Sequence, residues 1–482
     1  MRQRNTDMKS DPVSVSRRFL LMRTIRMGFC LSVFLLRLSL RALPRLGRGT
    51  ALKRLLGEEL AVLLEKMGAT YIKLGQILSS RPDLLSKDVA DPLARLQNDV
   101  APFDTRGLAE ILEQRLGRPL DEAFADFQWR PIAAASIAQV HRGLLHDGRQ
   151  VAVKIRRPGL LAQVYGDLEL LRLGAGLLGR LPGMGAVPMP ELVADLSRCI
   201  RRQLHFRREA DNLRRFHANF QDAAHITMPR LIEELCRDSV LTMEYLGDAK
   251  AVDDRAFSRQ ERRTAALAGL RALYKMIFLD GLIHADMHPG NVFLRPWGEV
   301  VLLDFGLVAE LDTEDRRRFV DFFFALVNNE GEVCANIIYE MALRRPRGFD
   351  KGGFRAAISD IVARHSSLRS QDFEITGFVF ELIDTQRHFG LRGSTDFIMT
   401  VLSMVVFDGI CKQLYPDCDF QREARPYLIT AKYTRISGTA AARTAGAQHQ
   451  KGLDRHGFQD SRLTGPGEAG RARHPASQAA FG

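Results

Sequence analysis

Three short polar motifs in a fixed order constrain this 482-residue chain more than any other feature. Lys154 ends the run VAVK, Asp286 and Asn291 lie within HADMHPGN, and Asp304 opens DFG 18 residues after Asp286. Alternating or continuous apolar residues before Lys154 and Asp304 predict strands there. A lysine ammonium suits phosphate, and carboxylate or amide oxygens suit Mg²⁺. The pattern therefore predicts a nucleotide-binding site.

The order of these motifs matches the strand lysine, the D-x-x-x-x-N loop and the D-F-G motif of protein kinases. In that arrangement Lys154 neutralises phosphate charge, and Asn291 and Asp304 bind Mg²⁺. Asp286 orients or deprotonates the attacking hydroxyl or water. We therefore predict an α+β, protein-kinase-like fold with two lobes that uses ATP and Mg²⁺.

The segment around Asp286 also has a metal-cluster alternative. His284, Asp286 and His288 form an H-x-D-x-H pattern that could hold a metal ion if the segment is a loop. No second cluster of His and Asp residues supplies the remaining ligands, so the kinase interpretation is favoured.

Positive charge is concentrated at the two ends of the chain. The formal net charge is +12, yet residues 1–56 hold 13 Lys and Arg against 2 Asp and Glu, and residues 432–482 hold 8 against 3. The middle is mildly acidic and offers no basic track for a phosphate backbone, so we predict no nucleic-acid partner. Residues 431–482 lack apolar periodicity and are predicted to be a disordered basic tail.

The N-terminal arm, residues 1–56, is basic and amphipathic. On a helical wheel, one arc of about 100° holds six arginines: Arg23, Arg26, Arg37, Arg41, Arg45 and Arg48. Its uninterrupted apolar run, like residues 397–407 near the C-terminus, is shorter than the roughly 20 residues that cross a bilayer. We predict peripheral contact with an anionic membrane through residues 15–48. Two alternatives are docking on the protein with the arginines in solvent, and a cleaved transit peptide.

Periodicity along the rest of the chain predicts three further parts. Residues 57–104 are a helical extension, and residues 105–246 are a small lobe with a strand–turn–strand at 135–157 and a strand at 239–246. Residues 247–430 are a helix-rich lobe with a helix at 262–280, a hairpin at 291–306 and helices from 315 onward.

Two kinase elements are altered. Where a glycine-rich loop would cover the phosphates, the chain has Ala133, Ala134, Ala135 and Ser136. Alanine resists the positive φ and close approach that glycine permits, so this loop should hold nucleotide differently. No A-P-E motif follows DFG, and the elements that dock a protein substrate are not evident. Glu244, by its place in the order, is the expected hinge residue whose backbone holds adenine.

Six segments together resemble the UbiB/AarF family of atypical kinases, which includes the mitochondrial ADCK-type proteins. They are YIKLGQILSSRPDLL, PIAAASIAQVHRG, VAVKIRRPG, FRREADN, HADMHPGN and LLDFG. The resemblance implies that the K-x-G-Q segment, with Lys73 and Gln76, packs over the active site and obstructs protein substrates. It implies that the alanine loop tunes nucleotide preference, and that Glu209 pairs with Lys154.

The resemblance also implies a role. Members support ubiquinone biosynthesis or handle related isoprenoid lipids, and they show ATPase activity more readily than protein phosphorylation. The expected partners are an isoprenoid lipid or quinone precursor and quinone-biosynthesis proteins. The expected location is the cytoplasmic face of the inner membrane in a bacterium, with mitochondria as the alternative.

The chain departs from the family where members carry E-x-D, because it has Gln203-Leu204-His205. The loss of both carboxylates puts regulation near the nucleotide in doubt; the simpler alternative is a solvent-facing helix turn. Two other functions stay open. HxDxHPGN also resembles small-molecule phosphotransferases, and a silent lipid-binding scaffold could use nucleotide as a conformational switch.

Overall fold

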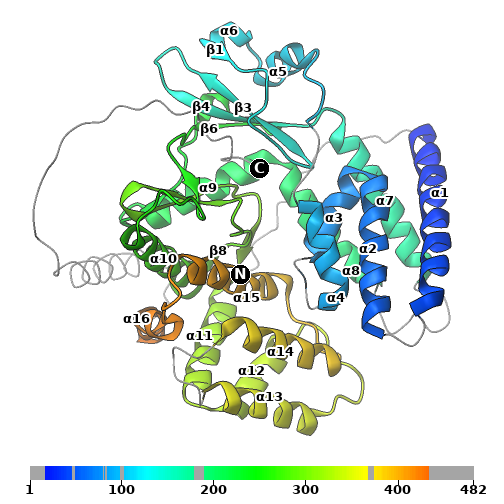
Figure 1. Ribbon diagram of the computed structural model, residues 1–482, viewed down its shortest axis with the longest axis vertical. Coiled ribbons are helices and arrows are strands. Elements are labelled where there is room, and N and C mark those ends of the chain that lie inside the picture. The colour runs from blue at the N-terminus through cyan, green and yellow to red at the C-terminus, as the bar shows by residue number, and fades with distance from the viewer. Residues whose placement is uncertain are drawn as a thin grey trace, which may run out of the picture.

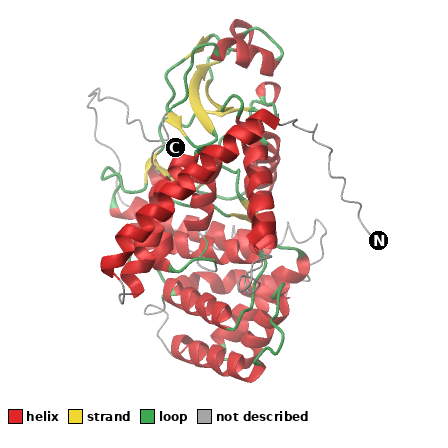
Figure 2. Cartoon of the chain, turned by 90° about the vertical axis from the view of Figure 1, so that its right-hand side faces the viewer, coloured by secondary structure: helices red, strands yellow, loops and turns green. Residues whose placement is uncertain are grey.

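The computed structural model has a kinase-like α+β fold in which a small β-rich lobe sits above a helical lobe, with a bundle of helices beside them (Figure 1). The structure describes residues 17–45, 49–79, 81, 84–97, 102–178, 189–366 and 374–433. Most of the predicted basic tail and the first 16 residues lie outside these ranges. Figure 2 shows the strands gathered in the upper lobe and at its junction with the helices below.

The small lobe is built on one antiparallel sheet in the order β1-β3-β4-β6, with β2 also paired to β3. The predicted strand–turn–strand forms the centre of this sheet, where Val140 pairs with Lys154 and Lys154 pairs with Leu241. Lys154 is thus fixed on a central strand. The elements of this lobe are α5 (Leu108–Leu116), α6 (Leu120–Ala123), β1 (Asp126–Phe127), β2 (Ala133–Ala134), β3 (Ala138–Leu144), β4 (Gln150–Arg156), α9 (Phe206–Phe220) and β6 (Val240–Glu244).

The helical extension does not stand alone. Its helices pack against a helical pair, α7 and α8, that leaves the small lobe after β4 and returns before α9 (Figure 1). An apolar cluster that includes Ile77, Leu168 and Ile200 joins the two parts. Helix α7 was not predicted from the sequence. These helices are α2 (Gly49–Met67), α3 (Ala69–Ser79), α4 (Lys87–Ala94), α7 (Leu160–Leu178) and α8 (Met189–Leu204).

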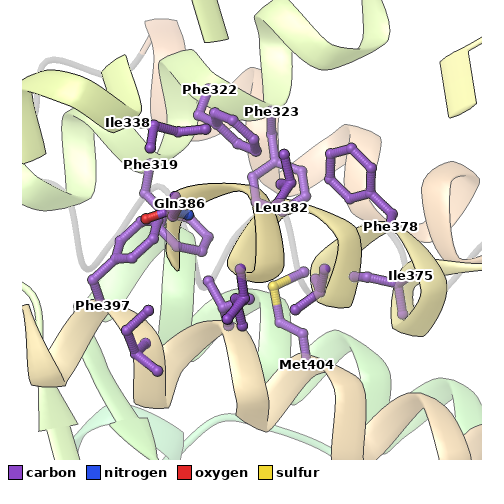
Figure 3. Close-up of a pocket in the computed structure, with 14 residues that line it drawn as sticks. Phe319, Phe322, Phe323, Ile338, Ile375, Phe378, Leu382, Gln386, Phe397 and Met404 are labelled. Atoms are coloured by element: carbon purple, nitrogen blue, oxygen red, sulfur yellow. The ribbon is translucent and has the colours of Figure 1, made fainter. Parts of the chain in front are cut away.

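The helical lobe surrounds the largest apolar core among the described residues. Its central helix α10 begins at a capping box on Ser258 and ends in a π-helical turn before β8. Phenylalanines from α11, α14 and α15 meet in this core (Figure 3) and leave a space of about 30 Å³ between them. The elements are β5 (Ile226–Thr227), β7 (Lys250–Ala251), α10 (Arg259–Tyr274), β8 (Leu282–His284), β9 (Val292–Arg295), β10 (Glu299–Leu302), β11 (Val308–Glu310), α11 (Thr313–Val327), α12 (Gly331–Met341), α13 (Lys351–Ser366), α14 (Ile375–His388), α15 (Thr395–Leu414) and α16 (Phe420–Tyr433).

Helix α1 (Arg17–Ala42) has the opposite orientation to the one the sequence predicted. The Arg23 guanidinium is buried and donates to both carboxylate oxygens of Asp167, at 2.6 and 2.7 Å. Arg37 and Arg41 both donate to the buried Glu59 of α2. Buried carboxylates need a partner, because an unpaired buried charge costs several kcal/mol. Arg23 is therefore buried against the protein, and the half-exposed Arg37 and Arg41 are directed toward Glu59. Arg48 and the side chain of Arg45 lie outside the described residues.

The outer face of α1 is apolar. Seven of its large side chains are more than half exposed: Leu21, Met22, Ile25, Phe29, Leu35, Leu36 and Leu40. By length and composition, α1 over Arg18–Ala42 and helix α15 could each cross a membrane. The prediction that both segments are too short was wrong, because the helices extend well past their uninterrupted apolar runs. About half of α15 is buried in its own lobe, and α1 is held by ion pairs.

Candidate functional site

An ion-paired triad joins the two lobes at the predicted site. The Lys154 ammonium on β4 donates to both carboxylate oxygens of Glu209 on α9, at 2.9 and 3.0 Å. It also donates to Oδ2 of Asp304, at 3.0 Å. Lys154 and Glu209 are buried, whereas the Asp304 side chain is 44% exposed. The Asp304 carboxylate is therefore the member of the triad that a ligand can reach.

One cation facing two carboxylates sets the protonation of the triad. Burial disfavours the charge of Lys154, but Asp304 and Glu209 outweigh it and raise the lysine pKa. Burial would also raise the pKa of Asp304, but Lys154 and then Lys73 hold it well below its ordinary value. Burial raises the pKa of Glu209, against the opposing effect of Lys154. The accessible carboxylate thus stays ionised and available to a cation.

Asp286 lies in a loop that its neighbours hold rigidly. The buried His284 accepts the Asp286 backbone N–H at its Nδ1 (3.2 Å), and its Nε2 donates to the carbonyl of Leu303 (2.8 Å). Burial lowers the His284 pKa, which keeps the ring neutral and suits this pattern of one donor and one acceptor. The Asn291 side-chain amide donates to the Asp286 carbonyl at 2.9 Å. His284 therefore links the loop of Asp286 to Leu303, which lies between β10 and Asp304.

The DFG segment is fixed in the same manner. Asp304 has a positive φ of 50°, and its Oδ1 accepts the backbone N–H of Gly306 at 3.0 Å. Phe305 is buried against Phe216 of α9. Asn212 of α9 donates to the Phe305 carbonyl at 2.9 Å. Residues 307–312 alone separate DFG from α11, so the long segment that docks peptides in protein kinases has no room here.

The triad, Asp286 and Asn291 line one cavity of about 810 Å³, and the helical extension forms part of its wall. Lys73 and Gln76 of α3 line this cavity, as do Arg81 and Leu85. Gln76 donates to the Leu96 carbonyl at 2.8 Å, which ties α3 to the turn after α4. A Cβ on Gly75 would lie 2.4 Å from Leu96, so glycine lets the two segments approach. Lys73 and Gln76 thus share a cavity with the predicted catalytic residues.

Some of the residues predicted to contact the nucleotide line the cavity, and others do not. Ala134, Ala135 and Ser136 line the cavity, whereas Ala133 pairs with Val140 in β2 and does not. Glu244, at the end of β6, is also not among the lining residues, and its backbone N–H donates to the Arg230 carbonyl. Three residues of the alanine loop therefore share the cavity with the triad, whereas Glu244 does not line it.

The segment that replaces E-x-D is not a solvent-facing turn. Gln203 is 6% exposed and lines the cavity, and its amide nitrogen has no hydrogen-bond partner among the described residues. His205 lies between α8 and α9 and bonds to the Asp238 carboxylate through Nδ1, at 2.9 Å. A single sequence gives no signal for this burial, because Gln203 lies in a helix rich in arginine.

The described residues fit a Mg²⁺ ion at Asn291 and Asp304 better than a histidine cluster. Asn291 donates through Nδ2, which leaves its Oδ1 available, and Asp304 is ionised and accessible. Both ring nitrogens of His284 are engaged with the backbone, and Nδ1 of His288 accepts from Gly290. No group of three or more His, Cys, Asp or Glu in the described part of the chain could hold a metal.

The comparisons with known proteins agree on one family. The family model described as "ABC1 atypical kinase-like domain" matches residues 95–338. Proteins named "Probable protein kinase UbiB" are similar over most of the chain. The one from Pseudomonas putida is 33% identical over 395 residues, which cover 80% of this chain and 72% of that protein. The one from Vibrio cholerae is 30% identical over 384 residues, with coverages of 77% and 70%.

Solved structures show a more distant likeness. The Rv3197–erythromycin complex from Mycobacterium tuberculosis is 20% identical with a TM-score of 0.47, covering 73% of this chain and 90% of that one. The Rio2 kinase complex with ADP, Mg²⁺ and phosphoaspartate from Chaetomium thermophilum is 13% identical with a TM-score of 0.26, covering 66% and 94%. From the family model and the relatives, this chain belongs to the ABC1 atypical kinase-like family and is a kinase of the UbiB type.

Proposed function

We propose that this protein uses Mg²⁺ and ATP as an atypical kinase or ATPase that supports ubiquinone biosynthesis at a membrane. One observation carries the proposal: Lys154, Glu209, Asp304, Asn291 and Asp286 line one cavity with the geometry of a phosphoryl-transfer site. The ubiquinone role rests on the UbiB name of the relatives.

Each residue has a physical task in this proposal. Lys154 faces the phosphates while Glu209 holds its ammonium in place. Asn291 and Asp304 would hold Mg²⁺, which would neutralise charge on the phosphates. Asp286 accepts a proton from the attacking hydroxyl or water. The wall formed by the extension favours a small acceptor over a folded protein.

Mg²⁺-dependent nucleotide binding tests the assignment. We expect Asp304→Asn to remove most of the thermal stabilisation that Mg²⁺-ATP gives the wild type, because the ionised ligand is lost. Asp360→Asn, on an exposed part of α13, is the matched control and should retain it. An unchanged shift in Asp304→Asn would exclude this residue as a metal ligand.

The cellular role requires a separate test. A deletion strain should accumulate quinone precursors, and a wild-type copy should restore the quinone profile. An Asp286→Asn copy should fail to restore it. Full rescue by Asp286→Asn would favour a scaffold over an enzyme.

We further propose that the apolar outer face of α1 makes the membrane contact, in place of the predicted arginine face. Support comes from the seven exposed apolar side chains and from the ion pairs that hold the arginines inward. Burial of apolar side chains in the interfacial region would then supply the affinity. For a bacterial protein this would be the cytoplasmic face of the inner membrane.

Liposome flotation separates the two faces. Phe29→Asp, 70% exposed on α1, should weaken flotation, whereas Leu343→Asp, 71% exposed after α12, should not. Because Arg23, Arg37 and Arg41 are paired with carboxylates, flotation should depend less on salt than contact through a free basic face would. Strong salt dependence of flotation, together with no effect of Phe29→Asp, would indicate that a basic surface makes the membrane contact instead.

A further inference from the structure

Helix α9, which lies below the sheet of the small lobe (Figure 1), is fastened to strand β4 at two points. Lys154 and Arg156 of β4 are two residues apart, so their side chains leave the same face of the strand. Lys154 bonds to Glu209 inside the helix. The Arg156 guanidinium reaches the start of the helix instead, and donates to the Leu204 carbonyl at 2.6 Å and to Oδ2 of Asp238 at 3.0 Å. The position of Glu209 therefore depends on how the first turn of α9 is held.

His205 stands between these two points. It directly precedes α9 and lies four residues, about one helical turn, before Glu209. Its side chain makes no capping bond to its own helix, and its Nδ1 bonds to the Asp238 carboxylate at 2.9 Å. The Phe206 backbone N–H donates to the Asp238 carbonyl at 3.0 Å. His205 is not among the described residues that line the cavity, so an effect on the reaction has to pass through α9.

The chemistry of the contact favours a donor at His205. With its hydrogen on Nδ1, the ring donates to Asp238 and leaves Nε2 to accept from the Tyr165 hydroxyl of α7, at 3.4 Å. Burial would raise the pKa of Asp238, but hydrogen bonds from His205 and then Arg156 lower it below its ordinary value. The acceptor is therefore ionised. The contact of 3.4 Å is long for a hydrogen bond, so the Nδ1 bond supplies most of the attachment.

We propose that His205 is a positioning residue, which donates to Asp238 and so holds the first turn of α9 with Glu209 against Lys154. An aspartate at this position, as in the E-x-D pattern, would face the ionised Asp238 and be repelled by it. That the alignment supports phosphoryl transfer rests on the proposed function. That His205 holds the first turn of α9 does not.

Two substitutions of nearly equal shape test the hydrogen bond. His205→Asn keeps an N–H donor near the place of Nδ1, whereas His205→Asp puts a second carboxylate beside Asp238. Phosphate release from Mg²⁺-ATP by the full-length protein should stay within about threefold of wild type in His205→Asn. In His205→Asp it should fall about ten- to a hundredfold, the range for a hydrogen bond to a charged group. The exposed His146 donates or accepts at one carbonyl of the small lobe, and His146→Asp is the matched control that should keep the rate.

A swapped variant, His205→Asp with Asp238→Asn, returns one donor and one carboxylate to the contact, so it should recover most of the rate. Hydrogen exchange measures the same contact without nucleotide. Amides of residues 206–210 should lose protection in His205→Asp and keep it in His205→Asn and in the swapped variant.

Three outcomes would overturn the proposal. They are equal rates and equal protection in His205→Asn and His205→Asp, a swapped variant that does not recover the protection of α9, and lost protection of α9 with a normal rate. A wild type that releases no phosphate, with the expected pattern of protection, would instead overturn the proposed function and leave the attachment of α9 by His205 intact.

Discussion

Replacing Arg23 by alanine should destabilise the protein far more than replacing Arg26, although both lie on the same helix and carry the same charge. The Arg23 guanidinium makes three hydrogen bonds, two to the Asp167 carboxylate and one to the Met67 carbonyl at 2.6 Å. Asp167 is completely buried, and Arg23 is 8% exposed. Arg26 is exposed and donates to one carbonyl, that of Lys66.

The magnitude follows from what each substitution leaves behind. Arg23→Ala leaves a carboxylate buried without its cation, and breaking a buried pair in this way costs about 3–5 kcal/mol. Arg26→Ala leaves a carbonyl that water can reach, so its cost should stay below about 1 kcal/mol. A double variant, Arg23→Met with Asp167→Leu, removes both charges and should recover most of the loss.

Denaturant unfolding of the three variants gives the size of the effect, and hydrogen exchange gives its location. Amides of α1, α2 and α7 should lose protection in Arg23→Ala, whereas those of the small lobe should not. Equal losses for Arg23→Ala and Arg26→Ala would refute the seating of α1 on Asp167. The arginine face would then be free, as the helical wheel first suggested.

Two further substitutions test packing and protonation. Alanine at Gly57 would place a Cβ 2.6 Å from the backbone oxygen of Val89, so the free energy of unfolding should fall by about 1–3 kcal/mol. At Gly28 no atom lies within 4 Å of the added Cβ, so alanine there should raise the free energy of unfolding by up to about 1 kcal/mol. Burial lowers the pKa of His141 below its ordinary value, so the unfolded chain binds more protons there, and stability should fall as pH drops below about 6.5. His141→Gln should flatten that dependence relative to the wild type in unfolding measured from pH 5 to 8, and an identical slope would show that the ring titrates normally.

The sequence predicted the core of the site because its information is local. A strand pattern predicts the position of Lys154. Asp286, Asn291 and Asp304 occur in short motifs whose spacing is set by a loop and a hairpin. The fold class followed from the order of those motifs. Glu209 and Lys73 required the family resemblance, since each sits on a helix whose position relative to the motifs no local pattern specifies.

Residues whose role depends on tertiary packing could not be predicted from local motifs. His284 was considered as a metal ligand, but its role appears only when the Leu303 carbonyl is seen opposite its ring. Asn212 lies in FRREADN, one of the segments that resemble the family. Its hydrogen bond to the Phe305 carbonyl nevertheless depends on how α9 packs against the helical lobe. Gln203 is polar and neighbours arginines, and its burial becomes evident only because α3, α8 and α15 line one cavity in the folded chain.

Helix α1 shows why a helical wheel leaves orientation undecided. The wheel correctly groups Arg23, Arg26, Arg37 and Arg41 on one side, but it cannot say whether water or protein faces them. Burial of arginine is unfavourable alone and acceptable beside a buried carboxylate. The carboxylates that decide the matter lie on other helices: Asp167 on α7, 144 residues from Arg23, and Glu59 on α2, 22 residues from Arg37. Because those carboxylates pair with Arg23, Arg37 and Arg41, the apolar side is left outside, and the membrane contact proposed for α1 rests on that apolar side.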